Sequence, residues 1–290
     1  MSSGYSYIRA KQIEWALNSK IPLTSSARAH GEKAYTQCLE QNLYEPLLDE
    51  NRTAFSGANG QELAGTPENP AKMQALNSSS ALGVNIFQYW QKRGLLDEIA
   101  AACRFCNKGS VYTKSLVFED KRFKLGGYLK TPPNIDVVIH NRESAPYECF
   151  AVECKFSEAY GGRSHGALKS AYLANESIWE GLPALHALAE KLTSKEHFYD
   201  YLYAAQLIRQ ILGLSNNLGR TKFRLLYLWY DVLGKAGGDH RAEVEDFTSI
   251  AKADGVHFHA LTYQELILKL AREYRDEHNA FIEYLTSRYL

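Results

Sequence analysis

The sequence predicts an α/β protein in which a mixed central sheet of about five strands is flanked by helices. The main evidence is the order of the elements, because helical segments, three consecutive strand-like segments and then alternating helices and strands follow one another along the chain. The composition agrees with this class: 45% of the 290 residues are apolar and 12% are aromatic, which suffices for a full hydrophobic core. Ordinary globular usage also excludes disordered, collagen-like and coiled-coil structures.

Residues 1–75 are expected to form a helical N-terminal extension that ends in a loop. Within residues 1–50, apolar residues recur at roughly helical spacing, which predicts helices there. The members of this pattern are Ile8, Ile13, Trp15, Ala16, Ala34, Cys38, Leu39 and Leu43. Glycine and proline break the pattern over Ser56–Pro70, which predicts an ordered loop. Residues 76–290 are expected to form the main domain as one compact unit, since no internal repeat or composition break divides them.

Two helices are predicted to precede the strands. Ser78–Ser80 can cap the first helix, and Gly94 separates it from a second helix that runs to Phe105. Beyond the first three strands, apolar spacing predicts mostly helical structure over 157–197 and an amphipathic helix over 198–213. Further helices are expected over Val244–Ala253 and, as one or two long C-terminal helices, over Tyr263–Leu290.

The predicted strands alternate in side-chain character or are continuously apolar. The first three lie close together in the chain and predict a meander: Ser115–Phe118, Ile135–His140 and Tyr147–Phe156. Lys222–Val232 is almost unbroken in apolar character, which is typical of a strand buried on both faces, so we expect it to be central. Val256–Leu261 is the expected fifth strand.

Acidic and basic residues interrupt two of these apolar strands. Asp136 lies within one strand, and Glu153 and Lys155 lie in the next, where the alternation of side chains puts both on one face. Pairing of the strands can bring the two carboxylates within reach of one Mg²⁺ ion, while the lysine orients a water or offsets charge on a phosphate. An exposed cross-strand ladder of charges is the alternative, but the apolar surroundings favour a site for phosphodiester hydrolysis.

The residues PNID, sixteen further positions and then ECK resemble the PD-(D/E)XK signature of the restriction-endonuclease-like nuclease superfamily. The order of elements over residues 76–232 is also similar to the core of that superfamily. The resemblance implies a Mg²⁺-dependent nuclease, in which Mn²⁺ can substitute, with Asp136 and Glu153 as metal ligands and Lys155 as the catalytic lysine. One departure is that the proline is not adjacent to the aspartate. The upstream stretch GANGQEL and the later PAKMQALNSSSALGVNIF further resemble a bacterial branch of this superfamily.

The resemblance also implies auxiliary residues near the site. Many members of the superfamily add an acid from an upstream helix, and Glu62 and Glu98 are both candidates, of which we favour Glu62. Related nucleases often place a glutamine on the helix that follows the E-x-K strand. Gln206 and Gln210 lie one helical turn apart there, and we favour Gln206 because apolar residues flank it. The alternative is that both glutamines belong to the solvent-exposed face of an amphipathic helix.

Affinity for nucleic acid has to be local, because 33 basic and 33 acidic residues leave no net charge. Between Arg104 and Ile135 there are 7 basic and 2 acidic residues, a local excess of 7 − 2 = +5. This excess predicts phosphate contacts that Arg163 and Lys169 could extend, although a solvated loop would have the same composition. The residues of this segment that we expect to contact phosphate are Lys121, Arg122 and Lys124.

The five cysteines indicate reduced thiols and a cytoplasmic protein, since their number is odd and their spacing irregular. Cys103 and Cys106 form one C-x-x-C pair without a second pair at zinc-site spacing, so we expect core cysteines. No apolar run approaches the ~20 residues that a bilayer span requires, and no membrane contact is expected.

Together, these observations predict a Mg²⁺-dependent DNA endonuclease that acts on double-stranded DNA in restriction or defence against foreign DNA. Cutting both strands commonly pairs two active sites, so a homodimer is expected, with the C-terminal helices as candidate interface. Two alternatives remain open at this point: a protein of nuclease fold that binds nucleic acid without cutting it, and a repair or RNA nuclease that uses the same site.

Overall fold

A mixed sheet forms the centre of the fold in the computed structural model, which describes residues 4–27, 31–57, 60–66, 68–126, 129, 131–162 and 167–290. Within these residues, the sheet has five strands in the order β3-β4-β5-β6-β7. The strands are β3 (Thr113–Asp120), β4 (Ile135–Asn141), β5 (Cys149–Lys155), β6 (Phe223–Trp229) and β7 (Phe258–Thr262). β3, β4 and β5 are antiparallel to one another, whereas β6 and β7 run parallel to β5. The predicted meander and the predicted fold class are therefore confirmed.

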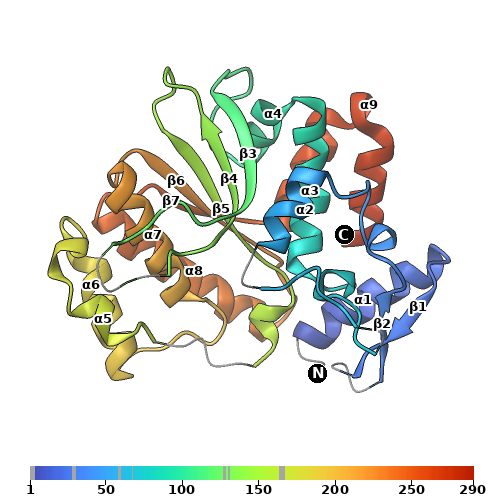
Figure 1. The fold of residues 1–290 in the computed structure, drawn as a ribbon, viewed down its shortest axis with the longest axis horizontal. Helices are drawn as coiled ribbons and strands as arrows, with labels where there is room; N and C mark the ends of the chain where they lie inside the picture. The colour runs from blue at the N-terminus through green and yellow to red at the C-terminus, as the bar shows by residue number, and fades with distance from the viewer. Residues whose placement is uncertain are drawn as a thin grey trace.

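Helices cover both faces of this sheet (Figure 1). On one side lie α3 (Ser79–Arg93), α4 (Leu96–Ala102) and α9 (Tyr263–Tyr289). On the other side lie α5 (Ser170–Leu173), α6 (Pro183–Ser194) and α7 (Ala204–Leu218), while α8 (Lys235–Ala253) packs against α6 and the outer strand β7. Because both faces are covered, every residue of β5 is buried, and β6 between β5 and β7 is nearly so, which explains its unbroken apolar sequence.

The N-terminal extension is only partly helical. α1 (Gly4–Asn18) agrees with the prediction, but the stretch around Ala34 and Leu43 is not a helix. It forms β2 (Lys33–Thr36), which pairs antiparallel with β1 (Leu23–Ser25), and a short 3₁₀ turn. The prediction of a second helix there was wrong because contacts with distant residues fix this segment: the buried Asn42 amide donates to the carbonyl oxygens of Met73 and Ala75.

Short elements complete the chain between these larger ones. α2 (Asp49–Ser56) lies over β3, where the ring centroids of Phe55 and Phe118 are 5.5 Å apart. The sequence analysis does not predict this helix, because it lies between the helical pattern of residues 1–50 and the predicted loop that begins at Ser56. The short elements are η2 (Leu39–Asn42), α2 (Asp49–Ser56), η3 (Lys72–Gln74), η4 (Glu158–Tyr160) and η5 (Glu176–Trp179).

The limits of α3 follow from local sequence, as predicted. The Ser78 hydroxyl accepts a hydrogen bond from the amide of Ala81 at 3.2 Å and so caps the first turn. Gly94 adopts a φ of 69°, the left-handed conformation that ends helices and that residues with a side chain rarely adopt. α3 begins, in consequence, at a fixed position beside β4 and β5.

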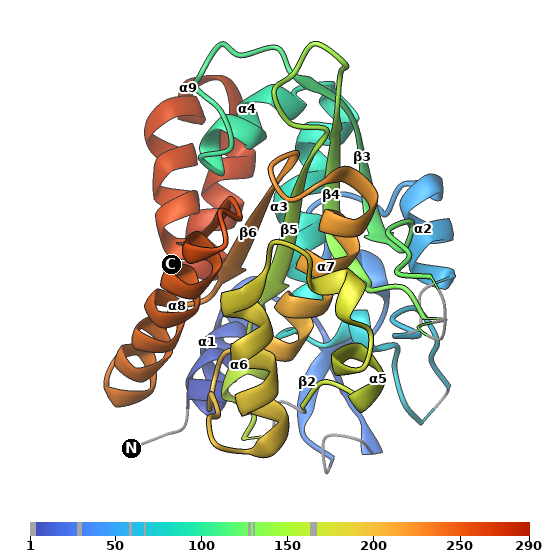
Figure 2. The ribbon, with the colours of Figure 1, turned by 90° about the vertical axis from the view of Figure 1, so that its left-hand side faces the viewer.

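The two ends of the chain pack against each other, as α1 and α9 lie side by side in Figures 1 and 2. The guanidinium of Arg288 is fully buried there, although no carboxylate pairs with it among the described residues. It donates to the side chain of Gln12 at 3.0 Å and to the carbonyl oxygen of Asn42 at 2.9 Å, and lies 4.2 Å from the ring of Trp15. Non-helical torsions at His278 (φ −131°, ψ 34°) divide α9, which agrees with the expectation of one or two long helices.

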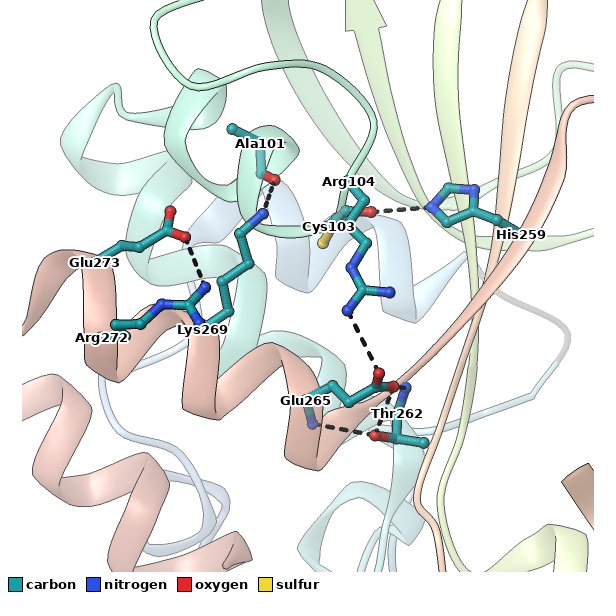
Figure 3. A network of polar contacts seen from close by, with 9 residues as sticks. All are labelled: Ala101, Cys103, Arg104, His259, Thr262, Glu265, Lys269, Arg272 and Glu273. Carbon is teal, nitrogen blue, oxygen red and sulfur yellow. Dashed lines mark hydrogen bonds and ion pairs between the residues drawn. The ribbon is translucent and has the colours of Figure 1, made fainter.

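The end of α4 is held by side chains of β7 and α9 (Figure 3). The carbonyl oxygens of Ala101 and Cys103 accept hydrogen bonds from Lys269 at 2.7 Å and from His259 at 3.0 Å, which satisfies groups that the helix end leaves unpaired. Cys103 is buried in the core, as expected, and all five cysteines have free thiols. No helix in the described part of the chain has the length and apolar character needed to cross a membrane.

Candidate active site

Pairing of β4 with β5 brings the two predicted carboxylates together. Val137 is paired with Val152, and continuing this antiparallel register by one residue sets Asp136 opposite Glu153. One carboxylate oxygen of Asp136 accepts a hydrogen bond from the backbone amide of Cys154 at 2.8 Å. The hairpin inferred from the spacing of the two acids therefore exists, and the backbone of one strand orients the acid of the other.

The E-x-K residues are buried rather than exposed. Glu153 is 0% exposed and Lys155 is 6% exposed, and the lysine ammonium donates a hydrogen bond to the Glu153 carboxylate. The same ammonium lies 4.9 Å from the centre of the Tyr203 ring. A solvated ladder of charges would have both side chains in water, so this alternative is excluded.

The charges of this group are strongly coupled. Burial and the negative charge of Glu153 raise the pKa of the Asp136 carboxyl well above its usual range. Burial alone would lower the pKa of Lys155, but the charges of Glu153, Asp136 and Glu158 outweigh it and raise that pKa. Lys155 is therefore an ammonium at neutral pH. Its single positive charge is surrounded by the three acidic side chains of Glu153, Asp136 and Glu158.

Glu119, which the sequence reasoning did not single out, belongs to the same group. It lies near the end of β3 with a φ of 55°, and the side-chain amide of Asn134 donates to its carboxylate. Burial and the charges of Glu62 and Glu153 raise its pKa to about 7. Glu119 and Asp136 also line one small cavity. The available signal in the sequence was an acid that directly follows the apolar strand Ser115–Phe118.

Of the two candidate upstream acids, Glu62 lies near this group and Glu98 does not. Burial and the charge of Glu158 raise the pKa of Glu62, which is hydrogen-bonded to Ser80 at the start of α3. Glu98 lies on α4, where its charge acts on Tyr274 of α9. The structure thus brings Glu62 towards Glu119 and Glu158.

Gln210 rather than Gln206 is the glutamine that contacts the site. The Gln210 amide donates to the Glu153 carboxylate and to the carbonyl oxygen of Asn134, the latter at 2.8 Å. Gln210 is fully buried because it lies on the inward stripe of α7 with Leu207 and Leu214. Our preference for Gln206 was wrong because apolar neighbours in the sequence do not determine which face of a helix a residue occupies.

Gln206 lines a groove of about 380 Å³ beside the site. The groove lies between α7, the start of α5 and the segment that precedes β4, and Gln210 forms part of its wall. Two cationic side chains, Lys169 and Arg209, also line it, and both residues are exposed. The groove thus connects a positively charged rim to the residues that hold Glu153.

The basic residues expected to contact phosphate differ in their surroundings. Arg122 forms an ion pair with the buried carboxylate of Asp120 at 2.8 Å, and Lys121 donates to the carbonyl oxygen of Gly57 at 3.0 Å. Lys124 is exposed. Lys169 lies on the rim of the groove, as described above, whereas Arg163 lies outside the described residues.

The donor set suits a hard cation with few protein ligands. In the part of the chain that the structure describes, no three His, Cys, Asp or Glu side chains are arranged so that they could hold a metal ion together. Mg²⁺ commonly binds through one or two carboxylates and completes its shell with waters and phosphate oxygens. The crowding of Asp136, Glu153 and Glu119 is the electrostatic situation that such a cation would relieve.

Comparison with known proteins identifies a family for nearly the whole chain. Residues 10–290 match the model of the family REase-ARP, which is described as "Restriction Endonuclease associating with ARP". Neither the search of curated proteins nor that of solved structures found a match. The family match agrees with the buried acid–lysine group on the paired strands β4 and β5. The chain thus belongs to a restriction-endonuclease family, REase-ARP.

Proposed function

We propose that this protein is a metal-dependent endonuclease that hydrolyses phosphodiester bonds in double-stranded DNA, in restriction or defence against foreign DNA. The observation that carries the proposal is that the paired strands β4 and β5 bring the half-buried Asp136 beside the buried, hydrogen-bonded pair of Glu153 and Lys155. Burying an ammonium and a carboxylate beside a second acid is costly, and such groups are typically found where charge serves a reaction. Membership of a restriction-endonuclease family supports the same class of activity.

In this proposal Asp136 and Glu153 would hold Mg²⁺, for which Mn²⁺ could substitute. When bound, the cation would lower the pKa of a water and offset negative charge on the phosphate. The chain's own residues fix the acids: the amide of Cys154 holds Asp136, and the side chain of Gln210 holds Glu153. Because Lys155 keeps its proton, it acts as a hydrogen-bond donor to a phosphate oxygen or to the attacking water rather than as a base.

The DNA backbone would follow the groove beside α7. Lys169 and Arg209 line this groove, and Gln210 links it to Glu153. Cations along the path neutralise phosphates and release counterions, which contributes affinity without reading the sequence. We also propose that two copies act as a homodimer, one on each strand.

Cleavage of a supercoiled plasmid tests the proposal. We expect cleavage to linear product with Mg²⁺ or Mn²⁺, and no cleavage with EDTA or with the Glu153→Gln variant. Linear product formed without a nicked intermediate would support paired sites. If the parent protein binds the plasmid but leaves it intact at every metal concentration, the non-cutting alternative holds. Faster cleavage of RNA than of DNA would favour the RNA nuclease.

A further inference from the structure

A second, aromatic pocket lies on the same side of the sheet as the groove. It has a volume of about 710 Å³ and is formed mainly by the connection between α6 and α7. Four rings from this connection line it, and they belong to His197, Phe198, Tyr199 and Tyr201. Phe198 is 74% exposed although its side chain is large and apolar. Packing within the described residues therefore does not explain why a phenylalanine stands there.

The connection that carries these rings is held firmly in place. The carboxylate of Glu243 on α8 accepts hydrogen bonds from three successive backbone amides, those of Asp200 at 2.7 Å, Tyr201 at 2.9 Å and Leu202 at 2.8 Å. The Tyr199 hydroxyl donates to Asp246 of the same helix. The backbone that follows Phe198 is thus fixed along the pocket, which limits the ordering that a ligand would require.

The pocket adjoins the groove that leads to Glu153. Ala167 and Ala205 line both, so that the two hollows share a wall. A cation lies at each hollow, with Lys195 lining the pocket and Arg209 lining the groove. A nucleic-acid strand whose backbone lies in the groove would therefore pass beside the aromatic pocket.

We propose that this pocket binds one unpaired nucleobase of the nucleic-acid strand whose backbone occupies the groove. Every base has a flat face that stacks on aromatic rings regardless of sequence, and Lys195 is suited to the adjoining phosphate. The volume lies within the range of small-molecule sites, which is about 300–1,000 Å³. A base stacked in a duplex cannot enter, so the strand must be single or the base extruded. The inference rests on the proposed function only in that the groove binds nucleic acid.

Binding measurements without metal test the inference separately from cleavage. A fluorescently labelled duplex with a single-stranded overhang is compared with a blunt duplex of equal paired length, by anisotropy in EDTA. Stacking energies predict that Phe198→Ala weakens binding to the overhang substrate by about 5- to 150-fold and leaves the blunt duplex unaffected. Leu17→Ala is the matched control, because it truncates a side chain that is 62% exposed at the far end of α1, and it should change neither affinity.

Two results would overturn the inference: unchanged affinity of Phe198→Ala for the overhang, or an equal loss for both substrates. In the second case Phe198 would be a general contact with duplex DNA. Failure of the parent protein to cut plasmid would remove the proposed nuclease activity but would leave a selective loss of overhang binding in support of the base pocket. Thermal unfolding of both variants by circular dichroism serves as the check on folding.

Discussion

Replacing Gln210 by leucine tests whether this glutamine positions Glu153. The substitution keeps the side-chain volume similar but removes the donor to the buried carboxylate and to the carbonyl oxygen of Asn134. A hydrogen bond to a charged group contributes about 1.5–3 kcal/mol and a neutral one about 1 kcal/mol. The free energy of unfolding should therefore fall by about 2–4 kcal/mol.

The matched comparison is Gln206→Leu, one turn earlier on the same helix. Gln206 lies on the groove wall, and Gln210 rather than Gln206 is hydrogen-bonded to Glu153, so we expect the free energy of unfolding of this variant to change by less than about 0.5 kcal/mol. Urea unfolding followed by circular dichroism measures both changes, with the denaturant slope as the check that the midpoint shift reflects stability. Equal losses in the two variants, or a larger loss for Gln206→Leu, would refute the assignment of Gln210.

Three further predictions concern Lys155, the basic residues that follow β3, and His259. Lys155→Met should lower the cleavage rate by roughly 10²- to 10³-fold, the usual cost of removing a donor to developing charge, while DNA affinity changes much less. Parental rates in the folded variant would remove Lys155 from the reaction. The Lys121→Ala, Lys124→Ala double variant should make the log–log slope of DNA affinity against salt concentration shallower by up to about 1.8. Arg122→Ala should leave that slope unchanged, because the Arg122 guanidinium is already paired with the Asp120 carboxylate. An equal effect of Arg122→Ala would contradict this reasoning. Burial lowers the pKa of His259 to about 4, below the ~6.5 of an unfolded chain, so the contribution of this residue to the unfolding free energy should be greatest above pH 6.5 and fall towards pH 4. At pH 5 this group should account for a loss of about 2 kcal/mol, and His259→Gln should show a flatter pH dependence of urea unfolding than the parent.

The sequence was sufficient to predict the strands of the sheet and the grouping of Asp136, Glu153 and Lys155. Alternation within 147–156 placed Glu153 and Lys155 on one face, and the chain length between the strands was right for a hairpin that sets Asp136 opposite Glu153. Both inferences depend only on the two-residue period of strands, which holds wherever a strand forms. The unbroken apolar run of β6 likewise indicated burial on both faces.

The parts that the sequence did not predict depend on contacts between distant segments. Glu119 joins the acidic group through a positive φ at the end of β3 and a hydrogen bond from Asn134, neither of which has a local signature. The β1–β2 hairpin has short strands stabilised by pairing, so the spacing of Ala34 and Cys38 was mistaken for a helix. Choosing between Gln206 and Gln210 requires knowing which face of α7 packs towards β5, and only the folded structure shows that this face carries Gln210.

The central claim is that Asp136 and Glu153 form a single site for a divalent cation, and calorimetric titration with Mn²⁺ tests it most directly. We expect one binding event in the parent protein, which Asp136→Asn abolishes. Glu98→Gln serves as the control, since that acid lies beside Tyr274 of α9 and should leave the affinity unchanged. Unchanged Mn²⁺ affinity in folded Asp136→Asn would contradict the account, because it would place the metal away from the paired strands.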